Sequence, residues 1–242
     1  MIFAGNCLYV DESDSDSVYD TAQSLLDFAL ETNIETLFRC KLFGGGTSPN
    51  KYQAGIGSKG IRTLREINEF IPTGTEVHNL NHIGHAILSG LDYIWVGARN
   101  CQNYSLLEDL KAFEGMILIK RSPGMTIDEL IGLYDICKDI HKLNDVYMVE
   151  RGINTFDRLD WSRWSPDLKG VIRLKHQRPE IFERLVVDCS HSVGEKLFID
   201  DTYKAFKAIG VEHFMFECTI DGKSKTDSNH MLSVDELKEI LI

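Results

Sequence analysis

Residues 93–120 have the sequence YIWVGARNCQNYSLLEDLKAFEGMILIK, in which an amphipathic segment separates two short apolar runs. The runs Tyr93–Gly97 and Met116–Lys120 have the length of β-strands. Between them, Tyr104–Phe113 carries apolar residues at three- and four-residue spacing, which is typical of an amphipathic helix. A strand, a helix and a second strand in this order predict a right-handed βαβ crossover and therefore a parallel sheet.

The same alternation continues along all 242 residues. Eight consecutive strand–helix units are what a closed (β/α)8 TIM barrel requires, and the length fits a compact barrel with few insertions. A doubly wound open sheet is the alternative. No Pro-rich or Gly/Ser-rich linker divides the sequence, so we expect one barrel domain over residues 1–242 and no separate regulatory domain. The predicted strands are Ile2–Cys7, Thr36–Cys40, Gly74–Val77, Tyr93–Gly97, Met116–Lys120, Val146–Glu150, Leu185–Asp188 and Phe214–Glu217.

Amphipathic segments lie between these strands, and two of them begin with a capping box. Thr126 is followed by Glu129, and Ser233 by Glu236, at the spacing that satisfies the first backbone N–H groups of a helix. The clearest predicted helices are Val18–Leu30, Ile61–Phe70, Tyr104–Phe113, Ile127–Ile140, Asp200–Ile209 and Ser233–Leu241.

Composition excludes several classes of function. The chain has 26 Lys and Arg against 37 Asp and Glu, a net charge of −11, which argues against broad nucleic-acid binding but allows a local basic pocket. No apolar stretch approaches the ~20 residues of a membrane span, and the N-terminus lacks a signal-peptide pattern, so no membrane association is expected. Six scattered cysteines without a C-x-x-C pair indicate reduced thiols in the cytoplasm.

Several predicted strands end in residues that an apolar strand would not select for packing. In a barrel these carboxyl ends converge on one face, where barrel enzymes carry out their chemistry. Arg39, Arg99, Lys120 and Arg151 form a cationic set suited to a small anion with phosphate or carboxylate groups. For each arginine, a structural ion pair is the alternative.

A second group, from the ends of three strands and the loop after the last strand, combines sulfur, nitrogen and oxygen donors. Cys7, His191, Glu217 and Asp227 suit a borderline divalent transition metal better than magnesium, which prefers oxygen ligands only. A buried core cysteine and a hydrogen-bonded polar histidine are the alternatives. The remaining histidines show no ligand-like spacing: His78, His82, His85, His141, His213 and His230.

Six segments, in order, resemble the metal-dependent phosphoenolpyruvate–aldose condensing enzymes. This family includes 3-deoxy-D-arabino-heptulosonate 7-phosphate (DAHP) synthase and 3-deoxy-D-manno-octulosonate 8-phosphate synthase, and the likeness is closest to the short β-type DAHP synthases. The segments are AGNC at 4–7 (family A-G-P-C), GARNCQN at 97–103 (G-A-R-N-x-Q-N), LIKR at 118–121 (L-L-K-R), ERGINTF at 150–156 (E-R-G-I-R-T-F), DCSH at 188–191 (D-P-S-H), and Glu217 with KTD at 225–227 (E…L-S-D).

The resemblance implies a TIM barrel that condenses phosphoenolpyruvate with an aldose or aldose phosphate and releases inorganic phosphate. Lys120 would donate a proton, and Glu76 would contact water or metal-bound solvent. Relatives usually form homodimers or homotetramers. The cationic set Arg39, Arg99, Lys120 and Arg151 would bind phosphoenolpyruvate, and Cys7, His191, Glu217 and Asp227 would bind a divalent metal ion (Mn, Fe, Co or Zn).

One segment departs from the family. DAHP synthases have K-P-R-T-S-P after the second strand, where Lys and Arg contact the acceptor, but residues 44–49 here are GGGTSP. Thr47 and Ser48 are still expected to contact substrate, and Lys41 or Arg62 could supply a replacement cation. The departure leaves open a related sugar-acid synthase with a different acceptor, or a non-catalytic metabolite-binding paralogue.

Overall fold

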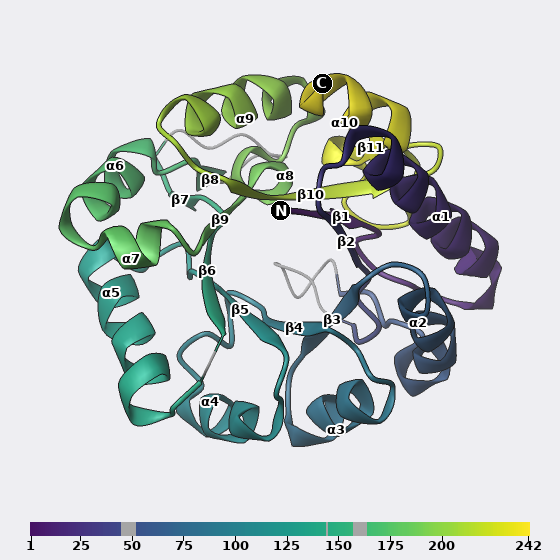
Figure 1. The fold of residues 1–242 in the computed structure, drawn as a ribbon, viewed down its shortest axis with the longest axis horizontal. Helices are drawn as coiled ribbons and strands as arrows, with labels where there is room; N and C mark the ends of the chain where they lie inside the picture. Colours follow the sequence, from purple (N-terminus) through teal and green to yellow (C-terminus); the bar gives the residue numbers. More distant parts are fainter. Residues whose placement is uncertain (45–51, 144, 157–163) are drawn as a thin grey trace.

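The computed structural model describes residues 1–44, 52–143, 145–156 and 164–242, and its centre is a closed parallel barrel (Figure 1). Successive strands pair in parallel, and the pairing of β1 with β10 closes the ring. This confirms the predicted (β/α)8 barrel and excludes the open sheet. The eight barrel strands are β1 (Ile2–Gly5), β2 (Thr36–Arg39), β3 (Thr73–Val77), β4 (Tyr93–Val96), β5 (Met116–Lys120), β6 (Val146–Glu150), β9 (Leu185–Asp188) and β10 (His213–Thr219).

Helices surround the barrel on its outside (Figure 1). Both predicted capping boxes are present, because Thr126 accepts from the backbone of Glu129 and Ser233 accepts from the backbone of Glu236. No described helix has the length and hydrophobicity needed to cross a membrane. The helices are α1 (Ser15–Thr32), α2 (Ile61–Asn68), α3 (Leu80–Leu88), α4 (Tyr104–Asp109), α5 (Ile127–Asp135), α6 (Leu168–Gln177), α7 (Pro179–Phe182), α8 (Cys189–Val193), α9 (Ile199–Ala208) and α10 (Val234–Leu241).

Short elements complete the carboxyl-end face. The pair β7 (Ile153–Asn154) and β8 (Trp164–Ser165) is antiparallel and follows β6, whereas β11 (Leu232–Ser233) extends the sheet beside the end of β10. The predicted helix to Ile140 ends in a π-helical turn, η5 (Ile136–Ile140). The remaining short turns are 3-10 helices: η1 (Glu12–Asp14), η3 (Gly57–Gly60), η4 (Leu110–Ala112), η6 (Lys196–Phe198) and η7 (Ser228–His230).

The side chains inside the barrel determine which polar residues reach its mouth. Alternate strand residues point inward, and the interior is packed with one buried set of apolar side chains. On four of these strands, the residue two positions after an inward apolar side chain also points inward. These four residues lie at the carboxyl ends of the strands and are all buried: Arg39, Lys120, Asp188 and Glu217. The apolar set consists of Phe3, Leu37, Tyr93, Trp95, Leu118, Val149, Val186 and Met215.

Gly74 on β3 makes room for the aromatic part of this packing. A Cβ at Gly74 would lie 2.5 Å from ring atoms of Tyr93, a fully buried residue whose hydroxyl donates a 2.8 Å hydrogen bond to the Phe38 carbonyl. Neither ring nor strand can yield easily in a close-packed interior. The glycine is therefore required by packing.

We expect Gly74→Ala to lower the free energy of unfolding by about 1–3 kcal/mol through overpacking against Tyr93. Gly84→Ala is the matched control, because an added Cβ on α3 meets open space, and alanine favours a helix by about 0.5–1 kcal/mol over glycine. Denaturant midpoints of the two variants should move in opposite directions. Equal midpoints would show that the Gly74 contact is unimportant.

Candidate active site at the mouth of the barrel

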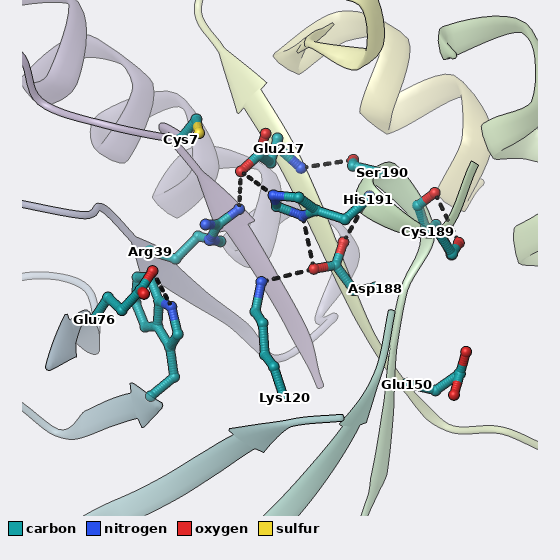
Figure 2. Close-up of polar contacts among 12 residues, drawn as sticks. Cys7, Arg39, Glu76, Lys120, Glu150, Asp188, Cys189, Ser190, His191 and Glu217 are labelled. Carbon is teal, nitrogen blue, oxygen red and sulfur yellow. Dashed lines mark hydrogen bonds and ion pairs between the residues drawn. The ribbon is translucent and has the colours of Figure 1, made fainter. Parts of the chain in front are cut away.

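Two buried ion pairs lie at the carboxyl ends of the strands (Figure 2). Arg39 Nη1 on β2 donates to Glu217 Oε1 on β10 at 2.8 Å, and Lys120 Nζ on β5 donates to Asp188 Oδ2 on β9 at 2.7 Å. The four side chains are at most 7% exposed. Burying such charges is costly unless each is compensated, so each residue of a pair depends on its partner.

Burial and pairing act against each other in this cluster. Burial alone would raise the pKa of Glu217, but His191 and Arg39 hold that pKa well below its usual range. Asp188 behaves in the same way, with His191 and Lys120 lowering its pKa. Burial lowers the pKa of Lys120, and the charge of Asp188 only partly offsets that effect.

Asp188 also organises the segment that carries His191. It is the N-cap of α8, and its Oδ1 accepts from the backbone N of His191 at 3.0 Å. Its Oδ2 lies 2.8 Å from His191 Nδ1, which directs His191 Nε2 toward Glu217 Oε1 at 3.2 Å. A carboxylate on one ring nitrogen is the arrangement that orients metal-binding histidines.

Four residues place possible metal-binding atoms within 4.8 Å of one another: His191, Glu217, Asp227 and His230. Cys7 lies beside this group, since its Sγ donates to Asp227 Oδ2 at 3.1 Å. The structure thus brings the four predicted ligands close together: Cys7, His191, Glu217 and Asp227. Imidazole, carboxylate and thiol donors, with Asp188 behind His191, fit a divalent transition metal.

His230 is the residue that the sequence analysis missed. Its spacing from other donors showed no pattern, yet its Nε2 lies 3.0 Å from Glu217 Oε2. The only sequence signal is its position three residues after Asp227, which becomes informative once η7 is known to connect them. Sequence spacing alone therefore did not indicate that His230 lies beside Glu217.

Glu76 on β3 lies in a separate part of the mouth. Trp95 Nε1 donates to Glu76 Oε2 at 3.2 Å, and His78 Nε2 lies 3.1 Å from Oε1. Lys41 Nζ is 3.8 Å from Oε2, and together with His78 it lowers the pKa of Glu76 although burial acts in the opposite direction. A side chain at Gly97 would collide with this carboxylate, at 2.3 Å from its Oε1.

Of the two suggested replacement cations, Lys41 lies beside Glu76 at the mouth of the barrel, whereas Arg62 lies outside it. Arg62 lies on the exposed face of α2, where it pairs with Glu66 at 2.8 Å. The predicted contacts Thr47 and Ser48 lie outside the described residues.

The other predicted cations differ in their surroundings. Arg151 is 4% exposed, its guanidinium lies 4.8 Å from the centre of the Trp164 ring, and among the described residues no carboxylate is within 4.0 Å of it. Arg39 Nε is also buried without a hydrogen-bond partner among the described residues. Arg99 is exposed in the turn that follows β4. Unsatisfied buried guanidinium groups are suited to an anionic ligand.

The arginine next to Lys120 faces the other way and has a structural role. Arg121 Nη1 donates to Glu150 Oε2 at 2.7 Å and to Asp167 Oδ2 at 2.8 Å. Glu150 Oε1 in turn accepts from Gly152 N at 2.7 Å, so this ion pair fixes the chain around Arg151. Figure 2 shows Glu150 apart from the central cluster.

Comparisons with known proteins agree with this geometry. A phospho-2-dehydro-3-deoxyheptonate aldolase from Thermotoga maritima is 26% identical over 197 residues, which cover 81% of this chain and 56% of that protein. The chain thus spans little more than half the length of that relative. A 2-dehydro-3-deoxyphosphooctonate aldolase from Campylobacter jejuni is 22% identical over 263 residues, covering 98% of this chain and 92% of the relative.

Solved structures show the same barrel. The crystal structure of a Thermotoga maritima DAHP synthase has a TM-score of 0.83 and 25% identity, and the match covers 100% of this chain and 67% of that one. A truncated form of the Thermotoga enzyme has a TM-score of 0.80. A family model described as the DAHP synthetase I family matches residues 1–242. Because that match extends over the whole sequence, the chain belongs to the DAHP synthetase I family.

Proposed function

We propose that this protein condenses phosphoenolpyruvate with an aldose phosphate and releases inorganic phosphate, as a DAHP synthase does. The observation that carries the proposal is the placement of buried cations directly beside a mixed nitrogen, oxygen and sulfur donor group inside one barrel mouth. That the protein has a single domain, is cytoplasmic and forms a homodimer or homotetramer remains a prediction from the sequence.

Phosphoenolpyruvate would be held by Arg39, Lys120 and Arg151. Arg39 ends β2, Lys120 ends β5 and Arg151 follows β6. Among the described residues, Arg39 Nε is buried without a hydrogen-bond partner, and Arg151 has no carboxylate within 4.0 Å. Phosphate and carboxylate groups both accept paired hydrogen bonds from arginine. Arg99, which is exposed in the turn after β4, is proposed as a further contact for phosphoenolpyruvate.

The residues Cys7, His191, Glu217 and Asp227 would hold a divalent Mn, Fe, Co or Zn ion. When bound, such an ion supplies Lewis-acid polarisation of the acceptor aldehyde. Asp188 fixes the His191 ring by its 2.8 Å contact with Nδ1, so that Nε2 points toward Glu217 and would be available to the ion.

Two side chains would assist while C3 of phosphoenolpyruvate attacks the aldehyde and water adds at C2. Lys120 is buried beside Asp188, and burial lowers its pKa, which would let its Nζ donate a proton during the reaction. Burial raises the pKa of Glu76, but Lys41 and His78 more than offset this and lower it, so the carboxylate would accept a hydrogen bond from water or metal-bound solvent and orient it. Loss of the phosphate breaks the C2–O bond and completes the reaction.

The decisive experiment measures phosphate release from phosphoenolpyruvate with a panel of aldoses, erythrose 4-phosphate first, after addition of Mn, Co, Zn or Fe. Release should require both substrates and should stop on chelation and return on adding metal. Arg62→Ala, on the outer face of α2, is the control and should match the wild type. Binding of phosphoenolpyruvate without release for any aldose would identify a non-catalytic paralogue.

Lys120→Arg should reduce kcat by about 10²-fold or more, because the charge beside Asp188 is kept but guanidinium does not give up its proton near neutral pH. Affinity for phosphoenolpyruvate, measured by titration calorimetry, should change much less than kcat. A kcat within twofold of the wild type would remove Lys120 from the proton-transfer step.

Arg151→Gln should weaken phosphoenolpyruvate binding about tenfold or more, the cost of losing a charge-assisted hydrogen bond of about 1.5–3 kcal/mol. Arg173→Gln on α6 is the control, since this exposed arginine pairs with Asp128 and Gln177 outside the barrel. Calorimetric affinities compare the two variants. Equal affinities in both would show that Arg151 does not contact the substrate.

A further inference from the structure

His230 is a buried imidazole that the proposed reaction leaves without a role. It ends η7, and its side chain is 8% exposed. Its ring centre lies 5.3 Å from that of His191, and the two planes are inclined at 53°. Two imidazoles therefore lie next to each other at the barrel mouth.

Both imidazoles are directed at the same carboxylate. His191 Nε2 lies 3.2 Å from Glu217 Oε1, and His230 Nε2 lies 3.0 Å from Glu217 Oε2. Asp227 also places an oxygen within 4.8 Å of these atoms. A histidine that served only as a hydrogen-bond partner for Glu217 would not need a second imidazole and a second carboxylate converging on the same point.

The local backbone explains why Asp227 and His230 face the same side. Asp227 has a left-handed backbone (φ 51°), which aspartate tolerates, and η7 follows as a single 3-10 turn. Residues three apart in a 3-10 helix are eclipsed, so their side chains project together. The pairing of Leu232 with Cys218 then fixes this turn beside Glu217.

We propose that His230 is a ligand of the metal ion, in addition to the residues expected from the family resemblance. The ion would then have two imidazoles and two carboxylates, with the Cys7 thiol next to Asp227. A second imidazole favours Fe, Co or Zn over Mn, because imidazole is a softer donor than carboxylate. The proposal rests on the metal-binding part of the proposed function and on none of its substrate steps.

The test uses Co²⁺ alone as the probe and needs no turnover. In the proton NMR spectrum of the Co²⁺-loaded wild type, each coordinated imidazole gives a hyperfine-shifted, solvent-exchangeable N–H signal. Two such signals are expected. His230→Gln keeps a donor for Glu217 but lacks an imidazole, so one signal should disappear and Co²⁺ affinity should fall at least about tenfold, the lower limit for perturbing a metal site.

Asp188→Asn is the matched control, because Asn retains the N-cap role toward α8 and no ligand is removed. It should weaken Co²⁺ binding yet keep both imidazole signals. One signal in the wild type would overturn the proposal without any variant, and so would an unchanged Co²⁺ affinity in a folded His230→Gln. Two signals without phosphate release would support the metal site and contradict the proposed reaction.

Discussion

The whole barrel mouth depends on compensating four charges that are buried together. Arg39 pairs with Glu217 and Lys120 with Asp188, all in a low-dielectric interior. Each carboxylate also makes contacts outside its ion pair. Asp188 caps α8 and orients His191, and Glu217 lies near the imidazoles of His191 and His230. Because removing one partner from a buried ion pair leaves the other uncompensated, the cationic half and the metal-binding half of the site cannot be changed independently.

Much of this arrangement follows from the sequence by strand periodicity. The strands Met116–Lys120, Val146–Glu150 and Leu185–Asp188 coincide with the predicted ones, since each is a short apolar run bounded by polar residues. Alternation then fixes which strand-end side chains point inward. The cationic and metal-binding groups were predicted as sets because all strands in such a barrel run in the same direction.

Other parts of the site could not be predicted, because they depend on contacts between loops. The position of His230 is set by one 3-10 turn and by the pairing of β11 with β10, and a lone histidine in a polar stretch carries neither signal. Asp188 looked like part of a motif, but its double role appears only when Lys120 from β5 is placed beside it. Helix α6 is not among the clearest predicted helices, and it buries only Gly170, Val171 and Leu174.

The net charge of −11 and the preference of the site for an anion are compatible because they act over different distances. Exposed carboxylates are screened within about 8 Å at physiological ionic strength, whereas charges inside the barrel are screened much less. An anion that reaches the mouth therefore responds mainly to Lys41, Arg151 and the two paired cations, all buried or nearly so. Of these, Arg151 has no carboxylate within 4.0 Å in the described part of the chain, which makes it the cation most available to a ligand.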